Sequence, residues 1–261
     1  MVLKSLHSLV GDTGATENNE RADVFLVRHG YAESRTTAQE AIAAGTVEAD
    51  GKKVLKASQK LNVGMKILYT PAHPFVSRGG IKLAAALDAF GLSPEGRICL
   101  DIGASTGGFT DILLRRGARR VYAVDVGHGQ LHERIKSDPR VVSLEGLDAR
   151  DLDAARIPER PYAIVADVSF ISLKLALPVA LSLVAQGAWA VLLVKPQFEL
   201  GKGNVPRSGV VKDQASRERV LKDIAAWVEA RGWTVSGTME SPIPGGEGNR
   251  EFLLAVGAPA Q

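Results

Sequence analysis

The sequence predicts an α/β fold built on a mostly parallel sheet that helices cover on both faces. Three observations predict it. From residue 97 onward, apolar runs of strand length alternate with stretches of helical character. Most of these runs are apolar throughout, which is typical of parallel strands buried on both faces. A glycine-rich segment, residues 101–108, follows the first run directly, and in such sheets ligands bind at the carboxyl ends of the strands.

Each element of this domain is placed by its own pattern. Strands are expected at RICLDIG, VYAVDV, VVSL, YAIVADV, AWAVLLVK and EFLLAV. Helices are expected at FTDILLRRG, at 172–183 and at 214–230. Because strands and helices alternate along the chain, we expect neighbouring strands to run parallel.

The N-terminal part has a different pattern. We expect a flexible tail over 1–20, a compact α+β unit over 21–69, a linker rich in proline and glycine over 70–80, and the α/β domain over 81–261. Within the small unit we expect helices over 22–28 and 32–45, and strands over 46–50 and 52–55 with a hairpin turn at Asp50-Gly51. The alternation of Leu61, Val63, Met65 and Ile67 predicts one more strand.

Composition and charge narrow the class of protein. The 261 residues carry a net charge of +3, which permits a nucleic-acid partner without requiring one. No run approaches the ~18 apolar residues of a membrane span, and residues 1–20 lack a secretory pattern. The single cysteine, Cys99, excludes an internal disulfide and is expected in the core. These features predict a cytoplasmic protein.

The glycine-rich segment LDIGASTGGFTD lies where a strand turns into a helix. Glycines let the backbone approach a ligand closely, and a helix N-terminus favours a negative group. The spacing matches neither the dinucleotide pattern G-x-G-x-x-G nor a phosphate loop. A tight turn without a ligand is the alternative interpretation.

Acidic residues follow the next two expected strands and favour a nucleotide-type cofactor. Asp125 lies about 20 residues beyond the loop, which suits the hydroxyls of a ribose, and Asp148 follows the third strand. This series is typical of an S-adenosylmethionine site, with the methionine over Gly103–Gly107, the ribose on Asp125 and the adenine near Asp148. The expected cofactor-binding residues are Asp101, Gly103, Ala104, Ser105, Thr106, Gly107, Gly108, Phe109, Asp125, Val126, Asp148, Ala149 and Asp167.

Four ionisable residues are candidates for chemistry. Asp167 and Lys195 end the fourth and fifth strands, so both are expected in the same crevice, where a lysine needs a partner. Lys82 precedes the sheet and Glu251 opens the last strand. Each of them taken alone could be a solvated surface charge.

The motifs SRGGIKL, LDIGASTGGFTD, YAVDVGHGQL, DVSFISL, VKPQFE and EGNREF, in this order, resemble the TlyA family with its FtsJ-like methyltransferase domain. The resemblance covers residues 21–261. It implies a Rossmann-like, S-adenosylmethionine-dependent methyltransferase with a seven-stranded sheet. It also implies 2′-O-methylation of ribose in ribosomal RNA, with cytidine as the target and a tetrad formed by Lys82, Asp167, Lys195 and Glu251.

The residue types of this tetrad suit the implied reaction. A ribose hydroxyl must approach the methyl group in line, and Lys195 would steer it and help to accept its proton. A second cation such as Lys82 lowers the pKa of a lysine, whereas Asp167 and Glu251 would hold both amines in place. The donor is already activated, so no metal is expected.

Residues 21–69 resemble the small RNA-binding domain named after ribosomal protein S4. The resemblance rests on Arg21, Asp23, Ser34, Arg35, Ala38, Ile42, Gly45, Val47 and Gly51. The expected partner is ribosomal RNA or a ribosomal subunit, which such a domain would position through its phosphates. The expected RNA-binding residues are Arg21, Arg28, Ser34, Arg35, Lys52, Lys53 and Arg78. A monomer would satisfy all of these expectations.

The sequence also admits four other interpretations. Methylation of a base amine would suit an Asn-Pro-Pro-Tyr-like motif, but DVSF has no proline pair and leaves Lys195 without a role. A membrane-acting haemolysin would need a spanning or amphipathic segment. A non-enzymatic ribosome-binding factor would not need the tetrad. Arg28-His29-Gly30 resembles the start of a histidine phosphatase, but we expect it to be a helix end.

Overall fold

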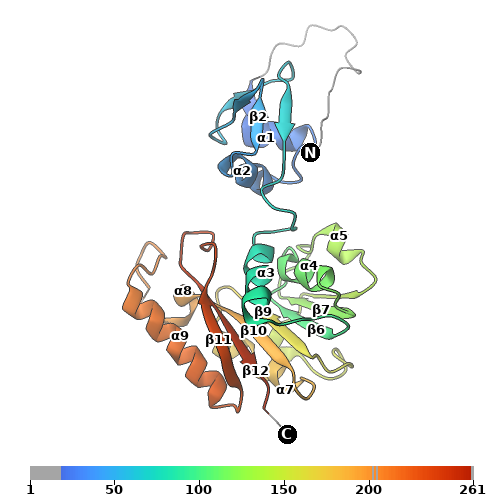
Figure 1. Ribbon diagram of the computed structural model, residues 1–261, viewed down its shortest axis with the longest axis vertical. Coiled ribbons are helices and arrows are strands. Elements are labelled where there is room, and N and C mark those ends of the chain that lie inside the picture. Colours follow the sequence, from blue (N-terminus) through green and yellow to red (C-terminus); the bar gives the residue numbers. More distant parts are fainter. Residues whose placement is uncertain (1–18, 202, 204, 260–261) are drawn as a thin grey trace. The chain divides into compact units, whose positions relative to one another are not determined.

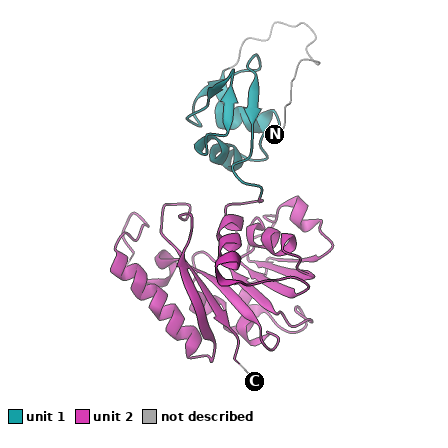
Figure 2. Ribbon diagram, viewed as in Figure 1, with its two compact units in different colours: residues 1–74 teal, residues 75–261 magenta. Residues whose placement is uncertain are grey.

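The computed structural model describes residues 19–201, 203 and 205–259 (Figure 1). The chain forms two compact units, residues 1–74 and residues 75–261 (Figure 2). The tail expected over 1–20 falls mostly on residues 1–18, which lie outside the described residues. Each unit has a hydrophobic core of its own.

The first unit is a small α+β domain. Its elements are β1 (Glu20–Arg21), α1 (Ala22–Arg28), α2 (Arg35–Ala43), β2 (Val47–Ala49), β3 (Lys52–Lys53), β4 (Lys60–Leu61) and β5 (Ile67–Tyr69). Strand β2 pairs antiparallel with both β3 and β5, and β1 pairs antiparallel with β4. The expected hairpin turn is confirmed, since Asp50 and Gly51 both have positive φ, at 50° and 75°.

The helices of this unit begin and end at recognisable residues. Ser34 and Thr37 form a reciprocal capping box at the start of α2. The helix expected over 22–28 is confirmed, and Gly30, with φ of 70°, follows its end. Arg28 and His29 therefore lie at a helix terminus, as expected, and not in a phosphatase-type strand.

The prediction of one strand over residues 61–67 is wrong. The chain instead makes a tight turn between β4 and β5, in which the Met65 N–H donates to the Asn62 carbonyl at 3.2 Å. The Asn62 side chain also accepts from the Gly64 N–H at 3.0 Å, and Val63 is exposed. The Asn-x-Gly turn signal was stronger than the alternation of apolar residues.

A buried carboxylate holds the two helices of the first unit together. Asp23, on α1, is fully buried and accepts hydrogen bonds from Arg21, from Arg35 and Gln39 on α2, and from the Val24 N–H. Burial alone would raise the pKa of Asp23. The hydrogen bonds from the two arginines and Gln39 outweigh it and hold that pKa well below its ordinary value of 3.8.

We expect Asp23→Asn to lower the free energy of unfolding of this unit by about 2 kcal/mol at neutral pH, because two arginines lose their charged partner. Native-state hydrogen exchange of the α1 amides measures this. A carboxyl with a lowered pKa stabilises above 3.8 and loses that contribution as the pH falls below it. The difference from the wild type should therefore shrink in acid. Unchanged α1 protection at neutral pH would contradict the assignment.

The second unit contains the large sheet. Its strands are β6 (Ile98–Ile102), β7 (Arg120–Asp125), β8 (Val141–Glu145), β9 (Ala163–Ala166), β10 (Trp189–Val194), β11 (Thr234–Glu240) and β12 (Phe252–Gly257). The strand order is β11-β12-β10-β9-β6-β7-β8. Strands β8, β7, β6, β9 and β10 run parallel, whereas β12 is antiparallel to both of its neighbours. The mostly parallel seven-stranded sheet is confirmed.

Helices cover both faces of this sheet (Figure 1). They are α3 (Gly79–Phe90), α4 (Gly108–Arg115), α5 (Glu133–Lys136), α6 (Leu173–Ala176), α7 (Pro178–Ser182), α8 (Pro196–Glu199) and α9 (Gln214–Glu229), with a 3₁₀ turn over Ala149–Asp151. Alternate residues of β6 face opposite cores: Leu100 contacts the side of α6, α7 and α9, whereas Cys99 contacts the side of α3 and α4.

Three features of this unit differ from the expected elements. Helix α3 starts inside the expected linker, and β5 ends at Tyr69, so the segment without regular structure is residues 70–78. Strand β11 was not expected, because its exposed and half-buried residues alternate at the edge of the sheet. The helix expected over 172–183 is split into α6 and α7, with Pro178 at the first position of α7.

Candidate active site

The sheet brings three predicted residues together where β9 and β10 end and β12 begins. Ala166 ends β9, Val194 ends β10, and Val194 is paired with Phe252 at the start of β12. The residues next in the chain are Asp167, Lys195 and Glu251. Because β12 is antiparallel to β10, the start of β12 meets the end of β10, so these three side chains leave the sheet side by side.

Lys195 forms an ion pair with Asp167. The Lys195 Nζ lies 2.5 Å from Asp167 Oδ1, and the two side chains are 11% and 23% exposed. The same amine donates to the Ser169 hydroxyl at 2.9 Å. Two anchors thus hold the amine at the carboxyl end of β10.

Lys82 and Glu251 form the second pair. The Lys82 Nζ donates to Glu251 Oε2 at 2.5 Å, and the side chains are only 9% and 2% exposed. Lys82 lies one turn into α3, whose apolar residues Leu83 and Leu87 anchor the helix on the sheet. The predicted tetrad is therefore present as two lysine–carboxylate pairs, one from β9 and β10 and one from α3 and β12.

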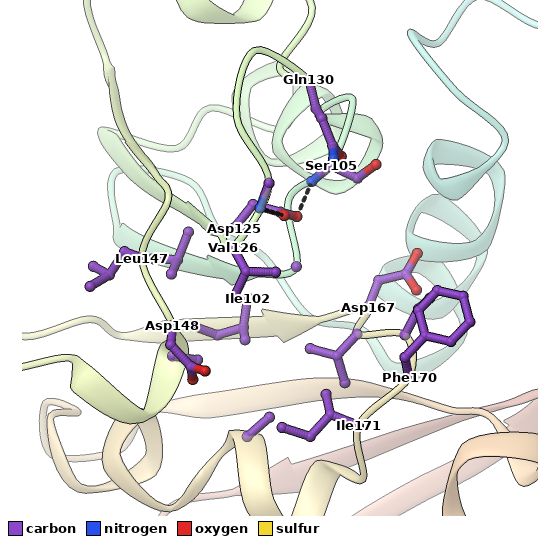
Figure 3. A pocket seen from close by; sticks show the side chains of 17 residues that line it. Ile102, Ser105, Asp125, Val126, Gln130, Leu147, Asp148, Asp167, Phe170 and Ile171 are labelled. Atoms are coloured by element: carbon purple, nitrogen blue, oxygen red, sulfur yellow. Dashed lines mark hydrogen bonds between the residues drawn. The ribbon is translucent and has the colours of Figure 1, made fainter.

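A cavity of about 380 Å³ opens at Asp167, the carboxylate of the first pair (Figure 3). Its size lies within the ~300–1,000 Å³ range of small-molecule sites. Among the expected cofactor-binding residues it is lined by Gly103, Ser105, Asp125, Val126, Asp148, Ala149 and Asp167. A smaller hollow of about 90 Å³ adjoins it at Gly103, Ser105 and Asp167, and Ala104, Thr106, Gly108 and Phe109 line that one.

Two of the expected residues lie beneath the hollows and line neither. Gly107 has φ of 93° and packs against Leu131 and Ile135, where a Cβ would stand only 2.9 Å from Leu131 Cδ1. Asp101 is fully buried within β6 and accepts from the Thr110 hydroxyl at 2.6 Å. Both residues therefore support the glycine-rich loop and do not face either hollow.

The carboxylate of Asp125 organises the loops around the larger cavity. It accepts from the Ser105 N–H at 2.8 Å and from the Gly127 N–H at 2.7 Å, as the dashed lines in Figure 3 show. Each carboxylate oxygen keeps a further lone pair for a ligand hydroxyl. Asp148 accepts hydrogen bonds from the guanidinium and from the backbone N–H of Arg150. Both bonds lower the pKa of Asp148, and the bond from the guanidinium has the larger effect.

Gly103 connects the glycine-rich loop to the tetrad. It has φ of 81°, and a Cβ there would stand 2.5 Å from the carbonyl oxygen of Asp167. Only glycine satisfies both the left-handed backbone and this close approach. The loop and the segment that carries Asp167 are consequently fixed against each other.

We expect Gly103→Ala to lower the free energy of unfolding of the second unit by about 3 kcal/mol, the sum of backbone strain and a clash with main chain. Gly129→Ala is the matched control, because Gly129 also has positive φ but has no atom within 4 Å of a Cβ. It should lose only about 1 kcal/mol. Urea unfolding followed by tryptophan fluorescence measures both, and equal losses would contradict the close approach.

The environment of Asp101 is unusual for a carboxyl group. Burial, and next the charges of Asp167 and Asp125, raise the pKa of Asp101 to about 7 against the hydrogen bond from Thr110. Its Oδ1 has no hydrogen-bond partner among the described residues. A buried, neutral carboxyl group at the base of the loop can donate a hydrogen bond from this oxygen.

A carboxyl with a raised pKa stabilises the fold when protonated, and this contribution is lost as the pH rises from 3.8 to about 7. Asp101→Asn has no proton to lose. Its unfolding free energy relative to the wild type should therefore increase across that window and stay constant above it. Paired thermal melts at several pH values measure the difference. A constant difference would contradict the raised pKa of Asp101.

Sequence reasoning missed an aromatic pair at the mouth of the cavity. Phe170 lines the cavity with its side chain 91% exposed, and its backbone has φ of 65°, rare for a residue with a side chain. Its ring lies 5.1 Å from the ring of Phe198. An exposed aromatic ring offers a stacking surface. The signal was present in the quoted motifs DVSFISL and VKPQFE, but periodicity assigns a role to neither ring.

The expected RNA-binding residues occupy different settings. Arg21 and Arg35 are partly exposed and share Asp23, and Arg28 pairs with Glu20. Ser34 caps α2, and Lys52 and Lys53 are exposed on β3. Arg78 belongs to the second unit, where it donates to the Pro244 carbonyl at 2.6 Å.

The described part of the chain contains no group of three or more His, Cys, Asp and Glu residues arranged to hold a metal ion. None of the helices described there is long and apolar enough to cross a membrane.

Comparison with known proteins places the chain in a family. Residues 75–258 match the model of the FtsJ-like methyltransferases, and residues 20–67 match that of the S4 domain. The 16S/23S rRNA (cytidine-2'-O)-methyltransferase TlyA of Mycobacterium tuberculosis (strain ATCC 25618 / H37Rv) is 45% identical over 236 residues, which cover 90% of this chain and 88% of that protein. The chain belongs to the TlyA family of FtsJ-like methyltransferases.

Other TlyA-family relatives carry a different name. Hemolysin A of Brachyspira hyodysenteriae is 42% identical, over 89% of this chain and 98% of that protein. A solved structure from Streptococcus thermophilus that also carries a hemolysin name is 40% identical, with a TM-score of 0.74, and covers 94% of this chain and 90% of that one. The family assignment expected from the sequence motifs is confirmed.

Proposed function

We propose that this protein transfers a methyl group from S-adenosylmethionine to the ribose 2′-oxygen of a cytidine in ribosomal RNA. The observation that carries the proposal is the pairing of Lys195 with Asp167, which lines the glycine-rich cavity, together with the buried pair of Lys82 and Glu251. The printed activity of the Mycobacterium tuberculosis relative supports the choice of cytidine and of ribosomal RNA.

The volume and the lining residues of the cavity support S-adenosylmethionine as its ligand. Backbone at Gly103 and Ser105 would lie along the methionine part, because both residues line the cavity and the smaller hollow that adjoins it. Asp125 would accept from the ribose hydroxyls, and Asp148 would lie at the adenine end. When bound, S-adenosylmethionine supplies an activated methyl group on a positively charged sulfur.

The lysines suit a reaction that needs orientation and proton removal without a metal. We expect Lys195 to orient the 2′-hydroxyl and, when its amine is deprotonated, to accept the hydroxyl proton, while Asp167 and Ser169 hold the amine in place. Lys82 would offer positive charge to the oxygen as negative charge develops there, and Glu251 holds the Lys82 amine in place.

The other unit and the aromatic pair suit an RNA substrate. Arg21, Arg35, Lys52 and Lys53 offer partly exposed positive charge for phosphates, which positions RNA without reading its sequence. Phe170 offers an exposed ring at the cavity mouth on which a base can stack. Because ribosomal RNA is the substrate in this proposal, the cytoplasm is the expected place of action.

We expect Lys195→Ala to lower the rate of methyl transfer to ribosomal subunits at least ~100-fold, because the hydroxyl loses its orienting and proton-accepting group. The assay uses labelled S-adenosylmethionine with purified protein and subunits. Cofactor affinity, measured by calorimetry, should persist, since Lys195 does not line the cavity.

Lys222→Ala is the matched control, because Lys222 is an exposed lysine on α9. It should transfer at the wild-type rate. Full activity of the Lys195→Ala variant would contradict the role given to this lysine. Absence of transfer by the wild-type protein to either ribosomal subunit would contradict the proposed function itself.

A further inference from the structure

The segment that follows β10 contacts the segment that follows β9 at three successive points. We call residues 195–199 the clamp and residues 167–173 the clamped loop. The Lys195 amine donates to the Ser169 hydroxyl at 2.9 Å, and the Phe198 ring lies 5.1 Å from the ring of Phe170. The third point is made by Glu199.

Glu199 uses both oxygens of its carboxylate on the clamped loop. Its Oε2 accepts from the Ser172 hydroxyl at 2.5 Å, and its Oε1 accepts from the Leu173 N–H at 2.8 Å. Ser172 in turn accepts from the Lys174 N–H at 3.1 Å and so caps α6. One carboxylate therefore fixes both the end of the loop and the start of the next helix.

The loop between these anchors is held in a conformation that it would not adopt alone. Phe170 has φ of 65°, and its side chain gains little from burial, because it is 91% exposed. A strained residue persists where its surroundings determine the backbone on both sides. On the N-terminal side, the Asp167 N–H donates to the Ile102 carbonyl of β6 at 2.9 Å. On the C-terminal side, the backbone is fixed by Glu199.

We propose that Glu199 is a positioning residue that keeps the clamped loop in its strained form and so holds the Phe170 ring at the mouth of the cavity for the RNA substrate. The part of this proposal that concerns RNA rests on the proposed function. The part that concerns the loop does not, because it follows from the contacts alone. Glu199 does not line the cavity, so it acts through Ser172, Leu173 and Phe170.

Hydrogen exchange tests the loop without any substrate. In Glu199→Ala, peptides that span residues 167–176 should exchange at least ~10-fold faster, because the Leu173 amide loses its acceptor and the cap of α6 loosens. Peptides from β7 should be unchanged. Glu199→Gln keeps an oxygen for the Leu173 N–H and should restore most of the protection. Ser172→Ala removes only one of the two contacts and should lie between the wild type and Glu199→Ala.

Steady-state kinetics tests the consequence for the substrate. With saturating S-adenosylmethionine, Glu199→Ala should raise KM for ribosomal subunits roughly tenfold, the size expected for losing hydrogen bonds to a carboxylate. Its kcat should change much less, because Lys195 keeps Asp167 as a partner. Glu199→Gln should return KM close to the wild-type value. The matched control is Glu229→Ala on α9, which is exposed and should leave both constants unchanged.

The outcomes separate the two proposals. Wild-type exchange over residues 167–176 in both Glu199→Ala and Ser172→Ala would overturn the clamp, whatever the activity. Faster exchange together with an unchanged KM would overturn the role of Glu199 in holding Phe170 for RNA. Faster exchange in an otherwise folded Glu199→Ala, with no methyl transfer by the wild type, would sustain the clamp and overturn the proposed function.

Discussion

Two lysines lie at the carboxyl end of the central strands with almost no access to water, and each requires a carboxylate beside it. An unpaired ammonium in such a place would be strongly destabilising, so the fold must deliver an acid to each amine. Asp167 comes from the parallel neighbour β9, whereas Glu251 comes from β12, whose antiparallel direction brings its first residue to the end of β10. The single antiparallel strand within the described sheet is therefore what completes the site.

The cofactor cavity and these ion pairs are not independent. Gly103 touches the Asp167 backbone so closely that a side chain cannot be inserted, and Asp125 holds two loop amides at the other side of the cavity. On the substrate side, the clamp, residues 195–199, contacts the clamped loop, residues 167–173. These contacts connect the amines, the glycine-rich loop and an exposed aromatic ring at the carboxyl end of the strands. Catalysis by orientation requires such fixed relative positions.

Much of this arrangement could be predicted from the sequence, because buried parallel strands are apolar throughout and their ends carry the polar residues. This pattern of apolar runs followed by polar residues placed Asp125, Asp167 and Lys195 correctly at strand ends. Strand β11 escaped prediction because an edge strand alternates only between exposed and half-buried residues. The positive φ of Phe170 and the bonds of Glu199 depend on contacts between segments about 27 residues apart, which no local pattern encodes.

The central claim is that the paired lysines act on a ribose hydroxyl. The most direct measurement is the position of the methyl group on ribosomal RNA treated with the protein and S-adenosylmethionine. A 2′-O-methyl group removes the nucleophile of alkaline cleavage, so the account predicts an alkali-resistant dinucleotide that begins with a methylated cytidine. A methyl group on a base, which leaves every phosphodiester bond labile to alkali, would contradict it.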